Sequence, residues 1–264
     1  MTSGSEMTSG GWKDRVFTPL QVLLTLGLFA EVIVICGIAL VPAVALLGWA
    51  SAALPPAGAW RLLGLGVAGA AGYFAFGLSL VVVLPIVRWV TLARGTPVGR
   101  FPYFSFGAWR WASYNALTLI LRFSFVNWIR VTPFLPLYHR LMGARIGRRV
   151  QINTAVVADQ NLIEIGDDTV IGGDVTLVCH SAERGHLVTA PVRIGSRVTI
   201  GLMAVVFPGC QIGDGAIVAA GAVLSKGTHV GPGEVWAGVP ARKVGKKARG
   251  DVRGEVTDLE RSSH

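Results

Sequence analysis

The stretch IGSRVTIGLMAVVFPGCQIGDGAIVAAGAVLSKGTHVGPGEVW, residues 194–236, has an apolar residue at every sixth position. Glycine or another small turn-forming residue usually follows it. A period of six predicts short strands joined by tight corners, three strands to a coil, with the apolar residues stacked inside a parallel β-helix. Glycine, asparagine and aspartate tolerate the unusual φ of a tight corner, so we expect them to follow the apolar residues for their backbone conformation.

The same spacing continues toward the N-terminus, with two breaks in register. Its apolar positions are Ile146, Ile152, Ala158, Ile165, Ile171, Leu177, Ile194, Ile200, Val206, Ile212, Val218, Leu224, Val230 and Trp236. A run of this length predicts an all-β domain over residues 146–246, in which each coil is stabilised by its neighbours. The break between Leu177 and Ile194 is too long for one hexad and predicts a loop extruded from the coil.

Two long apolar stretches precede the repeat. Leu62–Val87 carries no charge and is flanked by arginine and tryptophan at each end, and Phe17–Trp49 is interrupted by Glu31 and Pro42. About 20 apolar residues span the ~30 Å hydrocarbon core of a bilayer, and tryptophan favours its edges. We therefore expect an N-terminal transmembrane helical hairpin over residues 17–100. A buried core helix is the alternative for the second stretch.

Basic residues gather on one side of this expected hairpin, at Lys13, Arg15, Arg88, Arg94 and Arg100. The positive-inside rule then places both termini and the β-helix in the cytoplasm, with the hairpin in the cell (inner) membrane. The net charge of +9 suits either nucleic acid or an anionic membrane surface. Zinc-finger spacing and a basic recognition helix are both missing from the sequence, so we expect the lipid bilayer, and no nucleic acid, as a partner.

Residues 101–145 are rich in aromatic residues and arginines. The uncharged stretch between Arg110 and Arg122 has 11 residues, which is too short to span a bilayer. We expect interfacial amphipathic helices that hold the repeat against the membrane surface, and a third span is the alternative. Residues 1–16 are expected to form a polar tail, and the charged residues 247–264 a disordered one.

The repeat resembles that of the hexapeptide-repeat, or isoleucine-patch, acyltransferases. The stretch VWAGVPARK, residues 235–243, is similar to the motif that closes the β-helix in that family. LYHRLMGARIG, residues 137–147, is similar to the membrane-linked terminal region of poly-lysine-synthetase-type peptide synthetases. The resemblance implies a left-handed β-helix, a homotrimer with active sites between neighbouring subunits, and a coenzyme A-dependent O- or N-acetyltransferase.

In the family that the repeat resembles, the catalytic histidine lies at the base of an extruded loop, which is the place of His180 here. A neutral imidazole can accept the proton of a hydroxyl or amine while that group attacks a thioester. The resemblance also matches Asp159 with an acceptor-side aspartate, and a structural corner role is the alternative for it. Glu183 is the candidate for orienting the imidazole.

The same resemblance places acetyl-CoA, or another acyl-CoA, against the last coils. Carried over by position, the backbone of Ala220 meets the pantetheine arm. The coenzyme A phosphates are assigned to Lys226, Arg242 and Lys243. The alternative is that these three side chains are ordinary solvated charges without a ligand. We expect no metal, because the histidines lack the paired spacing of a carbonic anhydrase built on the same β-helix.

Two functions of different class remain open. The leading hypothesis is a membrane-anchored acyltransferase that moves an acetyl or other acyl group from coenzyme A to a small-molecule or lipid-linked acceptor near the membrane. The alternative is a non-catalytic β-helix scaffold, an accessory module of a peptide-synthetase or polymer-export system. Thioester cleavage in the presence of the protein and an acceptor separates the two.

Overall fold

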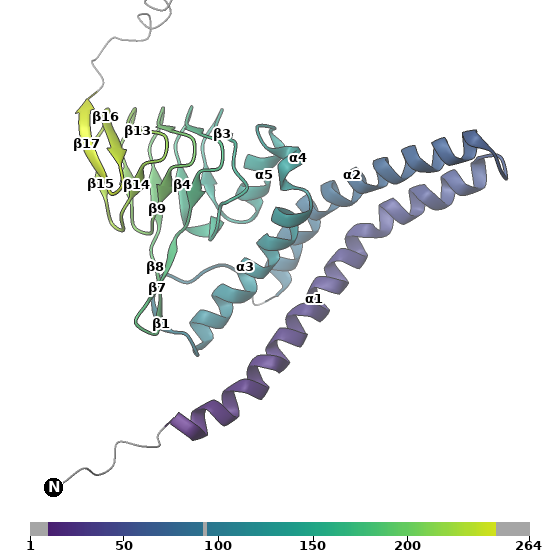
Figure 1. Cartoon of the computed structure of the whole chain (residues 1–264), viewed down its shortest axis with the longest axis horizontal. Coiled ribbons are helices and arrows are strands. Elements are labelled where there is room, and N and C mark those ends of the chain that lie inside the picture. The colour runs from purple at the N-terminus through teal and green to yellow at the C-terminus, as the bar shows by residue number, and fades with distance from the viewer. Residues whose placement is uncertain (1–9, 92–93, 247–264) are drawn as a thin grey trace, which may run out of the picture. The chain divides into compact units, whose positions relative to one another are not determined.

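The computed structural model describes residues 10–91 and 94–246. Residues 1–9 of the expected polar tail and all of the expected tail 247–264 therefore lie outside the described residues. The chain divides into two compact units, residues 1–83 and 84–264. Figure 1 shows long helices in the first half of the chain and a stack of short strands in the second.

The first unit is a helical hairpin, as predicted. It consists of α1 (Gly10–Ala53) and the greater part of α2 (Ala59–Val90). A Cβ atom built on Gly72 in α2 would lie 3.3 Å from the Cβ of Ala43 in α1. Small residues therefore allow the two antiparallel helices to approach closely, as they do in membrane helix pairs.

Apolar side chains surround both helices, and many of them face outward. Ile33 is 71% exposed, Leu62 75% and Trp60 77%. A helix that is hydrophobic all round normally lies in a protein core or in a bilayer. By length and composition, Val22–Ala53 and Ala59–Val90 could each cross a membrane, and no third helix in the described residues meets the same criteria.

Short helices lead from this hairpin into the strands. The elements that follow α2 are β1 (Gly99–Pro102), α3 (Phe106–Ser124), α4 (Val126–Ile129) and α5 (Phe134–Leu141). The hydroxyl of Ser105 caps α3 by accepting the backbone N–H of Ala108. The hydroxyl of Tyr114 donates to the carbonyl of Met142 at 2.7 Å, which ties α3 to the end of α5.

The repeat forms a left-handed parallel β-helix, which confirms the predicted fold class. The first face contains β2 (Arg145–Ile146), β4 (Ile163–Ile165), β9 (Val192–Ile194), β12 (Gln211–Ile212) and β15 (His229–Val230). The second contains β3 (Gln151–Ile152), β5 (Val170–Ile171), β10 (Thr199–Ile200), β13 (Ile217–Val218), β16 (Glu234–Gly238) and the antiparallel β17 (Ala241–Lys246). The third contains β6 (Thr176–Leu177), β11 (Val205–Val206) and β14 (Val223–Leu224).

The apolar residues of the hexads stack inward as predicted. Ile171, Ile200 and Val218 are aligned across three neighbouring strands, and none of them has exposed surface. Each such side chain removes apolar surface from water, and full burial contributes about 1.5–3 kcal/mol relative to exposure. The stacked ladders are therefore the hydrophobic core of the β-helix.

The glycine after each apolar residue has a different role from the expected one. The left-handed φ occurs two positions later, as at Arg197 (56°), Met203 (57°) and Gly215 (68°). At Gly201, by contrast, a Cβ would lie 2.5 Å from the backbone nitrogen of Ala220 in the next coil. The expectation of an unusual φ at these glycines was wrong. They are required because the coils approach too closely for a side chain.

The long break in the repeat forms a β-hairpin. Strands β7 (His180–Glu183) and β8 (His186–Thr189) pair antiparallel around a two-residue turn with φ values of 42° and 80°. Strand β1 joins as a third strand, and it pairs Gly99 with Thr189. The segment that precedes α3 is thereby hydrogen-bonded to the hairpin that carries the predicted base.

Replacement of Gly201 by alanine should lower the thermal midpoint of the detergent-solubilised protein. The added methyl overpacks the coil interface, and overpacking costs about 1–3 kcal/mol. Gly245→Ala is the matched control, because a Cβ on Gly245 would meet nothing within 4 Å. Equal losses in the two variants, measured by circular dichroism, would contradict the close-approach explanation.

Candidate active site

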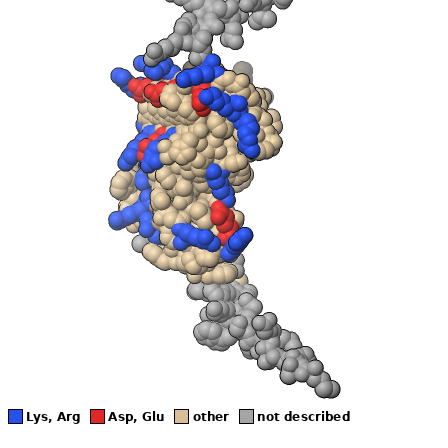
Figure 2. Space-filling model, turned by 90° about the vertical axis from the view of Figure 1, so that its left-hand side faces the viewer, with Lys and Arg blue, Asp and Glu red and all other residues tan. Residues whose placement is uncertain are grey.

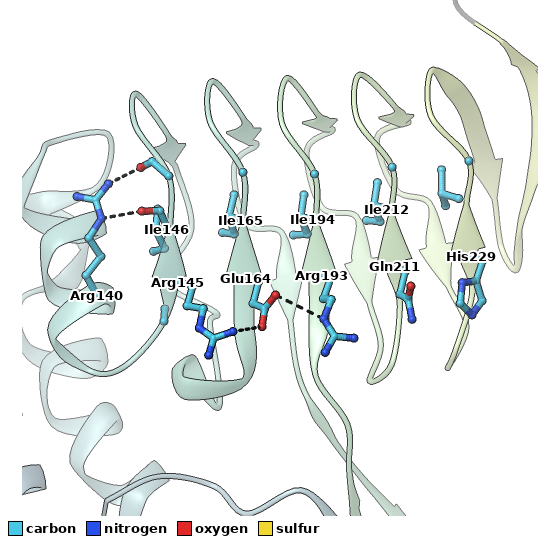
Figure 3. Close-up of a pocket in the computed structure, with 17 residues that line it drawn as sticks. Arg140, Arg145, Ile146, Glu164, Ile165, Arg193, Ile194, Gln211, Ile212 and His229 are labelled. Atoms are coloured by element: carbon cyan, nitrogen blue, oxygen red, sulfur yellow. Dashed lines mark hydrogen bonds and ion pairs between the residues drawn. The ribbon is translucent and has the colours of Figure 1, made fainter.

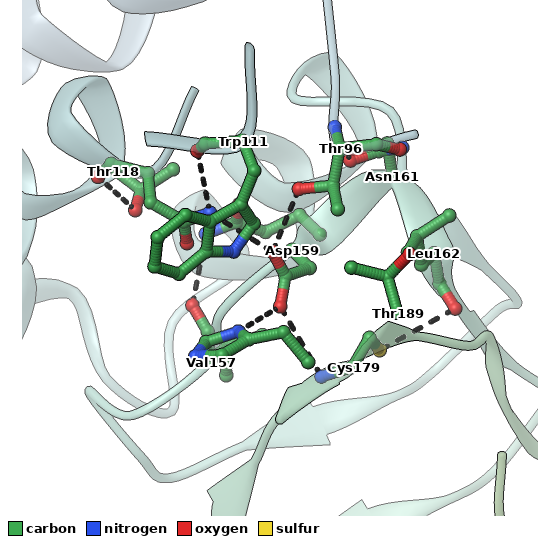
Figure 4. A network of polar contacts seen from close by, with 12 residues as sticks. Thr96, Trp111, Thr118, Val157, Asp159, Asn161, Leu162, Cys179 and Thr189 are labelled. Carbon is green, nitrogen blue, oxygen red and sulfur yellow. Dashed lines mark hydrogen bonds and ion pairs between the residues drawn. The ribbon is translucent and has the colours of Figure 1, made fainter. Parts of the chain in front are cut away.

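The predicted base, His180, begins β7 and faces a buried carboxylate. Its Nδ1 atom lies 2.6 Å from Oδ2 of Asp159, and the backbone N–H of Cys179 donates to the same oxygen at 3.3 Å. Asp159 has a left-handed φ of 57° and precedes the 3-10 helix η1 (Gln160–Leu162). Figure 4 shows its side chain at the centre of a polar network. Asp159 is thus a corner residue, and it also contacts the predicted base.

Two further donors reach the other carboxylate oxygen of Asp159. The hydroxyl of Thr96 donates to Oδ1 at 2.7 Å, and the side-chain amide of Asn115 donates to it at 2.9 Å. Thr96 lies just before β1 and Asn115 lies in α3, so both precede the β-helix in the chain. The sequence analysis did not predict either contact. The one signal in the sequence was the polar side-chain amide of Asn115 inside the uncharged stretch of α3.

The contacts of Asp159 favour its charged form. Burial raises the pKa of the carboxyl, but hydrogen bonds from His180, Asn115 and Thr96 together hold that pKa below its ordinary value. The carboxylate can therefore accept the Nδ1–H of His180 and leave Nε2 with a free lone pair. The His180 side chain keeps 28% of its surface exposed, so a bound substrate can reach it.

The indole ring of Trp111 packs against the imidazole. The two ring centroids are 4.9 Å apart and the ring planes meet at 66°, an edge-to-face arrangement. Trp111 lies in α3, one turn before Asn115. The same helix thus contacts both members of the His180–Asp159 pair.

Glu183 and Lys226, which were assigned separate roles, lie together. Their charged atoms are 2.5 Å apart, and the hydroxyl of Ser181 donates to the same Glu183 oxygen at 3.0 Å. The hydrogen bonds from Lys226 and then Ser181 hold the pKa of Glu183 below its ordinary value. The contact that orients the His180 ring comes from Asp159, while Glu183 positions the ammonium of Lys226.

The remaining cofactor residues lie on the last coils. Ala220 follows β13, in the corner that faces Gly201, whereas Arg242 and Lys243 belong to β17. The ammonium of Lys243 pairs with Glu234 at 2.7 Å, and the guanidinium of Arg242 donates to the backbone at 2.9 Å. Their roles toward coenzyme A stay predictions.

The thiol beside the base is a poor nucleophile. Cys179 is fully buried, and burial raises the pKa of its thiol well above the ordinary value. The nearby Asp159 carboxylate acts in the same direction. Because the thiolate is the reactive form, direct transfer to an acceptor is chemically more accessible than an acyl-cysteine intermediate.

A separate open groove of about 1000 Å³ runs along the first face of the β-helix. Figure 3 shows a row of outward side chains along it, contributed by Arg145, Glu164, Arg193, Gln211 and His229. Glu164 bridges its two arginine neighbours at 2.9 and 3.4 Å. No cluster of three potential metal ligands occurs within residues 10–91 and 94–246. The expectation of a metal-free enzyme stays a prediction.

The site joins His180, at the base of the extruded hairpin, to Asp159, at a corner of the left-handed β-helix. Residues 191–226 match the family model described as the hexapeptide repeat of succinyl-transferase. The YvoF protein of Bacillus subtilis (strain 168), which carries an acetyltransferase name, is 30% identical over 117 residues, or 42% of this chain and 68% of that protein. The chain belongs to the hexapeptide-repeat acyltransferase family.

Two other relatives differ in how much of their length is matched. Galactoside O-acetyltransferase of Escherichia coli (strain K12) is 35% identical over 107 residues, which are 38% of this chain and 52% of that enzyme. Delta-poly-L-ornithine synthetase of Acinetobacter baumannii (strain AB307-0294) is 29% identical over 181 residues, which are 65% of this chain but 13% of the synthetase. The match to the synthetase extends well beyond the repeat, as the resemblance in the sequence implied.

Asp159→Asn should make the thermal midpoint of the protein less dependent on pH in the acid range. The pKa of this carboxyl is lower in the folded protein than its ordinary value of 3.8, so its charge stabilises the fold above that value. The contribution is lost as the pH falls through the folded pKa. Between about pH 5 and pH 2, the thermal midpoint of the wild type should therefore drop more steeply than that of the variant. Parallel profiles would show that the contacts of Asp159 do not stabilise its charge.

Proposed function

We propose that this protein is a membrane-anchored acyltransferase that moves an acyl group, in the first place acetyl, from coenzyme A to a hydroxyl or amine of an acceptor near the membrane. The contact of His180 with the buried Asp159 is the observation that carries the proposal. Membership of the hexapeptide-repeat family supports it, and so do the acetyltransferase names of the relatives in Bacillus subtilis and Escherichia coli.

The proposed reaction is a direct transfer with His180 as general base. Nε2 takes the proton from the acceptor O–H or N–H as the acceptor forms a bond to the thioester carbonyl carbon. The tetrahedral intermediate then breaks its carbon–sulfur bond and expels the coenzyme A thiolate, which takes the proton back from His180. The Asp159 carboxylate stabilises the transient imidazolium and fixes its ring.

The coenzyme A phosphates would bind basic side chains near the hairpin and the last coils. Lys226 lies beside the hairpin through its ion pair with Glu183, and Arg242 and Lys243 follow on β17. A phosphate group can compete with Glu183 for the ammonium, because both present anionic oxygens. On the face of the molecule drawn in Figure 2, Lys and Arg cover more surface than Asp and Glu, as expected for a protein with anionic partners.

A membrane location is supported by two sets of exposed apolar residues. The first is the outward surface of α1 and α2. The second lies on α3–α5, where Phe106 is 63% exposed, Phe123 78% and Trp128 60%. Exposed aromatic residues beside arginines suit the headgroup region of a bilayer. We place the hairpin at residues 17–100, interfacial helices at 101–145 and the transferase domain at 146–246.

The acceptor would then be a small-molecule or lipid-linked group that reaches His180 from the membrane side. We propose the inner membrane as the location, with both termini and the β-helix in the cytoplasm, from the charge distribution around the hairpin. We also propose a homotrimer with closed cyclic symmetry, which is common among oligomers built from identical subunits. The family resemblance supports this assembly.

A second candidate is a non-catalytic module of a larger synthesis system. The observation in its favour is the match to the poly-ornithine synthetase, because 65% of this chain corresponds to 13% of that protein. A scaffold needs the β-helix but no general base. Loss of transfer on removal of His180 therefore distinguishes the two functions.

His180→Ala should lower kcat by about 10²- to 10⁴-fold, the usual contribution of a positioned general base. The KM for acetyl-CoA should change little, because donor binding is assigned to other residues. His186→Ala, on the opposite strand of the same hairpin, is the control and should keep wild-type kcat. Thiol release from acetyl-CoA with a panel of sugars and amines measures both. A fully active His180→Ala would remove this mechanism, and unchanged cellular function as well would favour the scaffold.

Cysteine labelling tests the proposed topology. Ala57→Cys, in the turn between α1 and α2, should react with a membrane-impermeant maleimide in intact cells. Val244→Cys, which is exposed on β17, should react after the cells are broken. The wild-type protein gives the background of its own three cysteines. Labelling of Val244→Cys in intact cells would place the β-helix on the opposite side of the membrane.

A further inference from the structure

Asp159 is held by residues from outside the β-helix. Thr96 follows the last residue of α2, Val90, by six positions, and Asn115 lies in the middle of α3. We propose that Thr96 and Asn115 are positioning residues for the Asp159–His180 pair, so that the segment leaving the second apolar helix is a built-in part of the catalytic site. This inference rests on the proposed function for the role of His180.

The segment around Thr96 is fastened to the first coil of the β-helix. The side-chain amide of Asn161 accepts the Thr96 N–H at 2.9 Å and donates to the Thr96 carbonyl at 2.9 Å. The hydroxyl of Thr189 donates to the carbonyl of Pro97 at 2.6 Å and accepts the N–H of Gly99 at 2.9 Å. With backbone contacts on both sides, Thr96 is directed at Oδ1 of Asp159.

Asn115 is held just as firmly from the side of α3. Its amide donates to the Trp111 carbonyl at 3.0 Å as well as to Asp159 at 2.9 Å. Neighbouring positions of the same helix are buried, and Tyr114, Leu117 and Leu121 lose nearly all of their exposed surface. Packing therefore holds this part of α3 in place, and the amide lies between the Trp111 carbonyl and Oδ1 of Asp159.

The two donors act on the base through the carboxylate. A buried carboxylate that loses hydrogen-bond donors becomes more basic. Two donors on Oδ1 stabilise the charge and also fix the plane of the carboxylate, so that Oδ2 stays aligned with Nδ1 of His180. Loss of one donor should therefore impair the proton transfer while leaving the thioester site intact.

Isosteric variants of the full-length protein in detergent test this role. Thr96→Val and Asn115→Leu each remove one donor to a charged group, which should lower kcat roughly 10-fold or more with little change in the KM for acetyl-CoA. Thr96→Ser keeps the hydroxyl and should stay near wild type. Thr118→Val is the matched control, because Thr118 is buried on the same helix and its hydroxyl donates to the Asn115 carbonyl at 2.8 Å.

A second readout does not depend on the acceptor. Diethylpyrocarbonate modifies neutral imidazole, and peptide mass spectrometry follows His180 separately from His186 and His229. Loss of one hydrogen-bond donor to Asp159 makes the Asp159–His180 pair more basic. The pH at the midpoint of His180 modification should therefore move upward in Thr96→Val and Asn115→Leu. The midpoints of His186 and His229 should stay in place. Thr96→Ser and Thr118→Val should show the wild-type midpoint for His180.

The outcomes separate this inference from the proposed function. Wild-type kcat and midpoint in both Thr96→Val and Asn115→Leu, with an inactive His180→Ala, would overturn the positioning role and leave the function intact. Equal losses in Thr118→Val would also overturn it, by showing a general effect of unpacking α3. A shifted midpoint in a protein that transfers no acyl group would support the positioning role while the proposed function fails.

Discussion

The close stacking of the coils governs the rest of this structure. Strands in a sheet lie about 4.8 Å apart, and at the corners that carry glycine the backbones of successive coils leave no room for a side chain. Glycine after the apolar residue of a hexad makes this contact possible, as Gly201 does against Ala220. This close stacking fixes which residues of successive coils pair with one another. Residues inserted beyond the six of a hexad must therefore leave the coil. The hairpin of β7 and β8 leaves in this way, and it starts from a strand end that lies beside Asp159.

The architecture could be predicted from the sequence because its signals are periodic and redundant. Hexad spacing predicted the β-helix, and the length of the two apolar stretches predicted the helical hairpin, since neither signal depends on one residue. The position of the left-handed residues could not be predicted in the same way. In several coils it is occupied by arginine or methionine, as at Arg197 and Met203, residues that seldom adopt a positive φ.

The site was less predictable because its contacts are distant in the sequence. His180 could be singled out from its place in the broken repeat, and Asp159 from a resemblance. Thr96 and Asn115 belong to a segment whose composition points toward the membrane, and the sequence offers no pattern that pairs them with an aspartate. Strand β1 was missed for a related reason, since its four residues acquire their pairing from the hairpin nearly ninety positions later. Tertiary contacts decide such short elements, and local propensity does not.

The separations between bonded residues also bear on the order in which this domain is completed. Contacts between coils join residues about one turn of the superhelix apart, such as Arg148 and Asp167, which are 19 positions apart. The bond from Thr96 to Asp159 spans 63 positions, and that from Gly99 to Thr189 spans 90. Loop-closure entropy rises with length, so short-range stacking can proceed coil by coil, whereas the long bonds require partners that are already formed. We expect the β-helix to condense first and the polar network to close last, which makes catalytic competence a late event in the maturation of the chain.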